Sequence, residues 1–149
     1  MSPSNVLPRA VARFLLLPIG MIAVAVFVRG LSSTGDGFAA GTVAALGVVL
    51  QYVVFGHREA ERRLPVRRAP LAAAAGLALG IGIGFAPLLF GDPVFTHLPP
   101  AGEKVAKLGT LELATSVAFD AAVFLTVFGM VVGIVRELAR AAEREDQEE

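Results

Sequence analysis

One aspartate, Asp120, interrupts an apolar stretch that is otherwise long enough to cross a membrane. Glu112, Ser116 and Asp120 recur at four-residue intervals, the spacing that places side chains on one face of a helix. A charged side chain at the centre of a bilayer costs roughly 2.5–3.5 kcal/mol on insertion scales, so such residues mark functional or paired positions. These three residues are therefore candidates for a proton or sodium path.

Two interpretations of Asp120 are open at this stage. Asp120 either contributes to an ion path or serves as a hydrogen-bonded assembly contact with a neighbouring helix. A proton relay or a sodium site needs several oxygen atoms in sequence, and the same segment adds only hydroxyl groups such as those of Thr115 and Thr126. Any further ligands would have to come from other subunits.

The composition predicts that the chain lies in a membrane. Of its 149 residues 55% are hydrophobic and 17% are charged, with a mean hydropathy of +0.69, which is too apolar for one small water-soluble core. The net charge of zero gives no reason to expect a nucleic-acid partner. The absence of cysteine excludes disulfides, thiolate metal sites and cysteine nucleophiles. Since no catalytic set, metal cluster or phosphate loop can be assembled either, we expect neither an enzyme nor a cofactor.

Four apolar segments predict an all-α membrane protein that forms one integral domain over residues 1–149. None of the segments alternates with the two-residue period of a membrane β-strand. The first could be a signal peptide, but its "AVA" at 23–25 lies inside the apolar run and three more apolar segments follow, so we expect a retained helix. The predicted helices cover about 11–28, 38–55, 69–90 and 111–135, followed by a cytoplasmic tail at 136–149.

Basic residues are distributed unevenly between the two ends of these segments. Ten arginines lie before the first segment, between the second and third, and after the fourth, whereas the other two connections hold only Arg29, Lys104 and Lys107. Basic residues next to membrane spans stay in the cytoplasm, so both termini are expected there. This bias argues against a small multidrug exporter, whose subunits often insert either way up.

Small residues recur along three of the four segments and predict close helix packing. The packing lies either within the chain or against other subunits. The residues concerned are Gly37 and Gly41 in the second segment, Gly76, Gly80 and Gly84 in the third, and Gly129 and Gly133 in the fourth.

Other polar residues have simpler expected roles. Gln51 is expected to hydrogen-bond to a neighbouring helix. Asp36 is expected to cap the second helix, with cation binding as the alternative. His57 and His97 are expected at the surface on opposite sides of the membrane, so they do not share a metal site.

The loop "VRGLSSTGDGFAAG" resembles the first external loop of the B-type proteins of multisubunit Mrp-type Na+/H+ antiporters, the MnhB/MrpB family. The family pattern there is Gly-His-Asn-x-Pro-Gly-Gly-Gly-Phe followed by another glycine. The positions that match are Gly30, Gly35, Gly37, Phe38 and Gly41, and those that depart are Leu31, Ser32, Thr34 and Asp36. Because Leu31 and Ser32 replace the histidine and asparagine, no role of that polar pair carries over.

The fourth segment is closer to the family pattern Phe-Asp-x-Gly-Val-Tyr-Leu-x-Val-x-Gly. The matching positions are Phe119, Asp120, Val123, Leu125, Val127 and Gly129, with Ala122 and Phe124 as replacements. The resemblance implies a non-catalytic subunit that works in a hetero-oligomer with other Mrp-type subunits in a prokaryotic cell membrane, exchanging cytoplasmic Na+ for external H+ only in the assembled complex. Similar subunits occur in membrane-bound hydrogenases, which are the alternative.

Overall fold

The computed structural model describes residues 6–30, 35–95, 106–108, 111–113 and 115–148, without the side chains of residues 90, 106–113 and 146–148. Most described residues are helical, and one short two-stranded antiparallel sheet joins them. The elements are α1 (Val6–Gly30), α2 (Gly37–Phe55), α3 (His57–Arg63), η2 (Val66–Arg68), α4 (Ala69–Phe85), η3 (Ala86–Phe90), β1 (Ala106–Leu108), β2 (Leu111–Leu113) and α5 (Thr115–Glu148).

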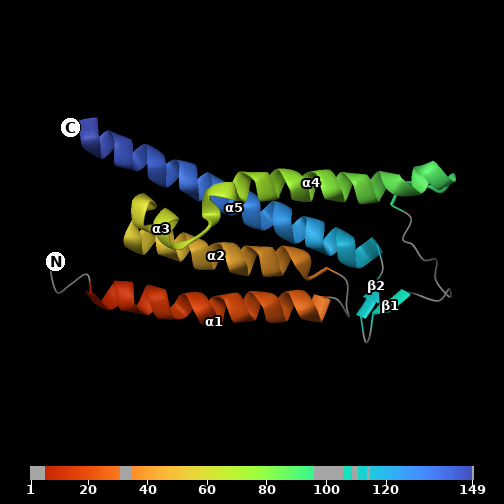
Figure 1. Cartoon of the computed structure of the whole chain (residues 1–149), viewed down its shortest axis with the longest axis horizontal. Coiled ribbons are helices and arrows are strands. Elements are labelled where there is room, and N and C mark those ends of the chain that lie inside the picture. The colour runs from red at the N-terminus through yellow and green to blue at the C-terminus, as the bar shows by residue number, and fades with distance from the viewer. Residues whose placement is uncertain (1–5, 31–34, 96–105, 109–110, 114, 149) are drawn as a thin grey trace.

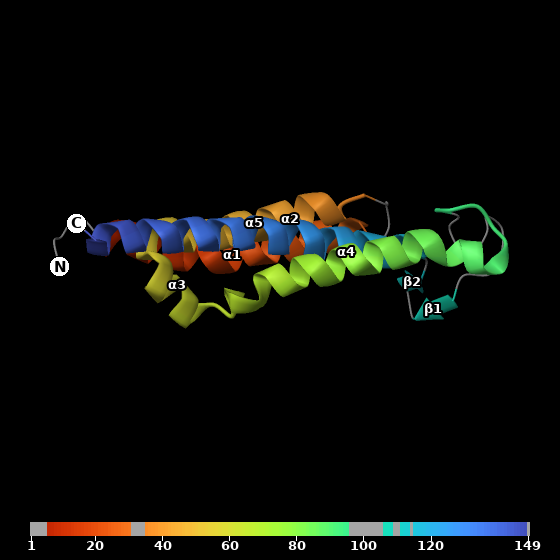
Figure 2. The ribbon, with the colours of Figure 1, turned by 90° about the horizontal axis from the view of Figure 1, so that it is seen from above.

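Four helical stretches of the described chain are long and apolar enough to cross a membrane, which confirms the predicted four-helix membrane fold. Figures 1 and 2 show the long helices running along the same axis of the molecule. Helix α5 contacts both α2 and α4, and α1 contacts α2. The two chain ends lie at one end of the bundle, and the β1–β2 pair lies toward the other (Figure 1).

The ends of the helices differ from those expected. Helix α1 begins at Val6, before the expected residue 11, and accommodates Pro8 in its first turn, where a missing N–H costs little. Helix α4 ends at Phe85 and the chain continues as the 3-10 turn η3, which contains Pro87. Helix α5 is 34 residues long, about 51 Å at 1.5 Å per residue, so it extends well beyond a hydrocarbon core of about 30 Å.

Close contacts between helices are made where glycine leaves room. A methyl group on Gly76 of α4 would lie 2.6 Å from the carbonyl oxygen of Ala122 and from Oγ1 of Thr126, both in α5. A methyl group on Gly41 of α2 would lie 2.9 Å from the carbonyl oxygen of Phe124. These two contacts hold α5 between α2 and α4, so the observed packing of these glycines lies within the chain.

The remaining glycines of the predicted packing set have different neighbours. A side chain on Gly129 would collide with the backbone of Ala73, whereas Gly80 and Gly133 have ordinary contacts. A methyl group on Gly84 would lie 2.7 Å from the ring of Phe95, so this glycine meets the connection that follows α4. The small-residue ridge of α4 therefore packs against α5 only over part of its length.

A buried hydrogen bond fixes α1 on α2. The Nε2 amide of Gln51 donates to the carbonyl oxygen of Ala12 at 2.7 Å, which confirms the expected contact with a neighbouring helix. Gln51 is 3% exposed and Ala12 is 1% exposed. The bond sets the level at which the first turns of α1 stand beside the end of α2.

Candidate functional site

Asp120 contacts the loop before α2. Its Oδ2 accepts a hydrogen bond from the backbone N–H of Gly35 at 3.0 Å, and the residue is 8% exposed. Asp120 lies five residues after the start of α5 at Thr115, about 7.5 Å along the helix axis. The carboxyl group is therefore close to the end of the bundle opposite the chain termini.

Two glycines allow this approach. Gly35 has a φ of +116°, which a residue with a side chain rarely adopts. Gly37, the first residue of α2, packs directly on the backbone of Asp120, and a methyl group there would collide with its carbonyl oxygen. The glycine-rich loop and the aspartate of the fourth long helix, which are 85 residues apart at Gly35 and Asp120, thus form one site.

The expected role of Asp36 as a helix cap is wrong. Asp36 precedes α2, but its side chain makes no capping hydrogen bond, because its backbone (φ −86°, ψ −2°) is helical rather than extended as capping residues usually are. Its Oδ2 lies 3.6 Å from Nε of Arg29 at the end of α1. A second carboxylate and a guanidinium group therefore flank the loop that bonds to Asp120.

The expected polar stripe on one helix is also wrong in part. Glu112 lies in strand β2, where it stands opposite Lys107 of β1, so it does not share a helical face with Ser116 and Asp120. The hairpin replaces the first turn that was expected for the fourth helix. Ser116 is half-buried in the first turn of α5, and Thr126 donates its hydroxyl hydrogen to the carbonyl oxygen of Ala122 at 2.8 Å within that helix.

Of the predicted site residues, the structure brings together Gly35, Gly37 and Asp120, with Gly30 against Asp36. Phe38 is 61% exposed at the start of α2. His97 lies outside the described residues. No group of three or more potential metal ligands is present among the described residues.

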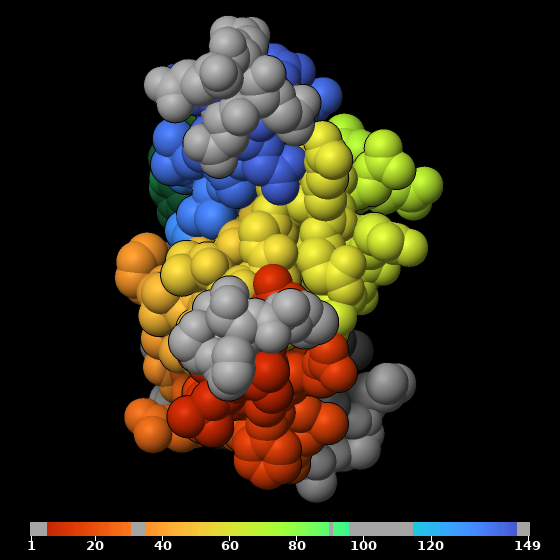
Figure 3. Space-filling model, turned by 90° about the vertical axis from the view of Figure 1, so that its left-hand side faces the viewer, coloured from red at the N-terminus to blue at the C-terminus, as the bar shows by residue number. Residues whose placement is uncertain are grey.

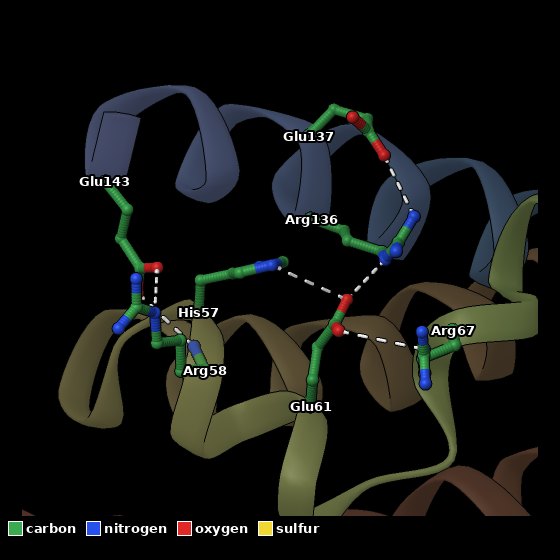
Figure 4. A network of polar contacts seen from close by, with 7 residues as sticks. All are labelled: His57, Arg58, Glu61, Arg67, Arg136, Glu137 and Glu143. Carbon is green, nitrogen blue, oxygen red and sulfur yellow. Dashed lines mark hydrogen bonds and ion pairs between the residues drawn. The ribbon is translucent and has the colours of Figure 1, made fainter. Parts of the chain in front are cut away.

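A second polar cluster lies at the end of the bundle that carries the termini (Figure 4). Oε1 of Glu61 in α3 accepts a hydrogen bond from Nε of Arg136 in α5 at 2.5 Å. Nε2 of His57 lies 3.8 Å from the same oxygen, and Nε of Arg67 lies 4.0 Å from the other one. Glu61 thereby joins α3, η2 and α5.

The electrostatics of Glu61 explain why it stays ionised. Burial opposes its charge, but the hydrogen bond from Arg136 and the charges of Arg136, His57 and Arg67 outweigh this effect and hold the pKa of Glu61 below its usual value. The side chain of His57 is only 11% exposed, so the expected surface position is wrong. A single sequence gave no signal for this cluster, because Glu61 and Arg136 are 75 residues apart.

We expect Glu61→Gln to destabilise the attachment of α3 to α5 by about 1–3 kcal/mol, between the values for exposed and buried ion pairs. The substitution leaves the guanidinium group of Arg136 facing a neutral amide. Thermal denaturation of the full-length chain in detergent measures the effect. Glu145→Gln, at an exposed position of α5, is the matched control, and an equal loss of stability in both variants would contradict the assignment.

The same pair gives a pH dependence with a defined sign. Because the pKa of Glu61 is lowered in the folded chain, the folded state binds fewer protons there than the unfolded state. Its contribution to stability is complete above the ordinary glutamate pKa of about 4.3 and is lost as the pH falls through the lower folded-state value. The stability difference between the wild type and Glu61→Gln should therefore be present at neutral pH and shrink on strong acidification.

The fold and the two polar sites define a small multi-pass helical membrane protein with a carboxyl group bonded to a glycine-rich loop. The chain belongs to the MnhB family: the model for "Domain related to MnhB subunit of Na+/H+ antiporter" matches residues 7–133. The resemblance seen in the sequence is thus confirmed, and the match includes both the Gly35 loop and Asp120.

Individual relatives agree with the family match. The chain is 30% identical over 136 residues to the B-type Na+/H+ antiporter protein of Alkalihalophilus pseudofirmus, covering 91% of this chain and 93% of that protein. It is 31% identical over 112 residues to the protein of the same name from Bacillus subtilis, covering 75% and 77%. It is 35% identical to a probable K+/H+ antiporter protein of the combined A/B type from Rhizobium meliloti, covering 93% of this chain but only 14% of that longer protein.

Proposed function

We propose that this chain is a non-catalytic membrane subunit of a multisubunit monovalent cation/proton antiporter. It supports assembly of the complex and places Asp120 beside an ion path that other subunits complete. The observation that carries this proposal is the hydrogen bond from Gly35 to Asp120, because it joins the two segments on which the family resemblance is based. Relatives named as antiporter subunits support it.

The chemistry available at this site fits a contributing role rather than a complete path. Asp120 offers one nearly buried carboxyl group, held by a backbone N–H from the loop, and Asp36 beside Arg29 adds a second carboxylate nearby. A buried carboxyl group can exchange a proton or help to bind a cation, but a cation needs several oxygen ligands. Partner subunits would supply the remaining groups.

The proposed orientation places both termini in the cytoplasm of a prokaryotic cell, because ten arginines lie at that end of the spans. The site around Asp120 then faces the outside, and the cluster around Glu61 faces the inside. Sodium is the first cation to test and potassium the second, since relatives carry either ion in their names. These names do not favour the hydrogenase alternative.

Deletion of the gene in its own host tests the proposal. Everted membrane vesicles from the deletion strain should lose the proton efflux that added Na+ or K+ triggers in wild-type vesicles. A plasmid copy of the full chain should restore it. Unchanged exchange with both cations in the deletion strain would contradict the proposal.

A further inference from the structure

A cavity of about 470 Å³ opens between α1, α2 and α3 at the end of the bundle that carries the termini. Its lining includes Arg9 and Arg13 of α1, Phe55 of α2, and Glu59 and Arg63 of α3. Figure 3 looks at this end, with the first turns of α1 in red below α3 in yellow. None of these residues belongs to the sites around Asp120 and Glu61.

The charge in this cavity is positive and only partly balanced. Arg63 is held by Glu59, with its Nε 2.7 Å from Oε1. Arg9 and Arg13 stand one helical turn apart on α1, and neither has a hydrogen bond or close ion pair among the described residues. Three guanidinium groups therefore surround one carboxylate that already has a partner.

The cavity also has an apolar side that is suited to lipid. The guanidinium group of Arg63 lies 4.6 Å from the centre of the Phe55 ring, which directs it along the edge of the cavity. On α1, Leu7 and Phe14 flank the two arginines and are 72% and 77% exposed. The buried bond between Gln51 and Ala12 holds this part of α1 against α2, so the arginines keep their place beside Phe55.

We propose that Arg9, Arg13 and Arg63 bind the phosphate of an anionic phospholipid of the adjoining leaflet, with its acyl chains along the exposed apolar face of α1. Basic pockets between membrane helices on the cytoplasmic side bind anionic head groups, and guanidinium groups match the oxygens of a phosphate in geometry and charge. A phosphodiester satisfies the two guanidinium groups of α1, and the apolar flank excludes a purely aqueous anion. This inference does not depend on the antiporter function.

The test uses photoreactive phosphatidylglycerol in vesicles of phosphatidylcholine that contain the full-length chain with its copurifying subunits. After illumination, mass spectrometry maps the labelled peptides. Labelling should concentrate on residues 6–13 and 53–63 in the wild type. The double variant Arg9→Gln/Arg13→Gln should lower this labelling by about tenfold or more, and Arg9→Lys/Arg13→Lys should retain most of it.

A matched double variant separates a specific pocket from general surface charge. Arg140→Gln/Arg144→Gln removes the same charge from exposed positions of α5 at the same end, and it should leave the labelling of residues 6–13 unchanged. Recovery of the same subunits with every variant checks that the assembly is intact. Equal labelling in the wild type and Arg9→Gln/Arg13→Gln would overturn the proposal, as would an equal loss in the α5 variant.

Two further outcomes would also overturn it. Competition by glycerol 3-phosphate at millimolar concentration would assign the pocket to a free phosphate ester instead of a lipid. Protection of residues 6–13 from labelling in the intact complex, with labelling regained when another subunit is removed, would assign the pocket to a partner protein.

Discussion

Asp120→Asn is expected to remove most cation/proton exchange while the complex still assembles. An asparagine side chain keeps an oxygen that can accept the hydrogen bond from Gly35, so the contact between the loop and α5 can persist. It cannot carry a negative charge or exchange a proton. If Asp120 takes part in the ion path, we expect exchange to fall by roughly tenfold or more, measured as cation-dependent proton movement in everted vesicles.

Asp120→Ala and Asp92→Asn complete this experiment. Alanine removes both the charge and the hydrogen-bond acceptor, so it should impair assembly as well as transport. Asp92, an exposed residue of the turn after α4, receives the same substitution as Asp120 at a position outside the site and should behave as the wild type. Normal exchange by Asp120→Asn, with lost assembly only in Asp120→Ala, would show that Asp120 is a purely structural contact.

Gly76→Ala is expected to have the largest effect on the stability of the chain. A methyl group there would lie 2.6 Å from three atoms of α5: the carbonyl oxygen of Ala122, and the backbone nitrogen and Oγ1 of Thr126. The backbone atoms cannot move aside singly, so α4 and α5 must separate. Overpacking of this kind typically costs about 1–3 kcal/mol.

Gly82→Ala is the matched control for this substitution, since Gly82 lies in the same helix and has no heavy atom within 4 Å of its would-be methyl group. Alanine also favours helix over glycine by roughly 0.5–1 kcal/mol, so this variant should be as stable as the wild type or slightly more so. Thermal denaturation of fluorescent fusions, followed by size-exclusion chromatography, compares the two. Equal denaturation curves would mean that the close contact between α4 and α5 does not form in the protein.

The sequence predicted the membrane spans well, because a span is a local property of composition and length. The start of α5 was missed because residues 111–113 form a strand that pairs with residues 106–108, and an apolar stretch does not reveal such a partner. The extension of α5 to Glu148 agrees with the helical spacing of its arginines.

The sites were predicted only as far as single residues carry a signal. Asp120 stood out because a carboxyl group in an apolar segment needs a reason, but its partner, the N–H of Gly35, has no side chain to mark it. The role of Asp36 was misjudged because it depends on a backbone angle. The ion pair of Glu61 with Arg136 needed the fold, since many charged residues at that end are possible partners.

Purification of the tagged full-length chain from its own host in mild detergent, with mass spectrometry of the proteins that copurify, tests the central claim most directly. The account predicts recovery of several other membrane subunits related to cation/proton antiporters, in a fixed ratio with this chain. Recovery of the chain alone as a homo-oligomer, or together with hydrogenase subunits, would contradict it.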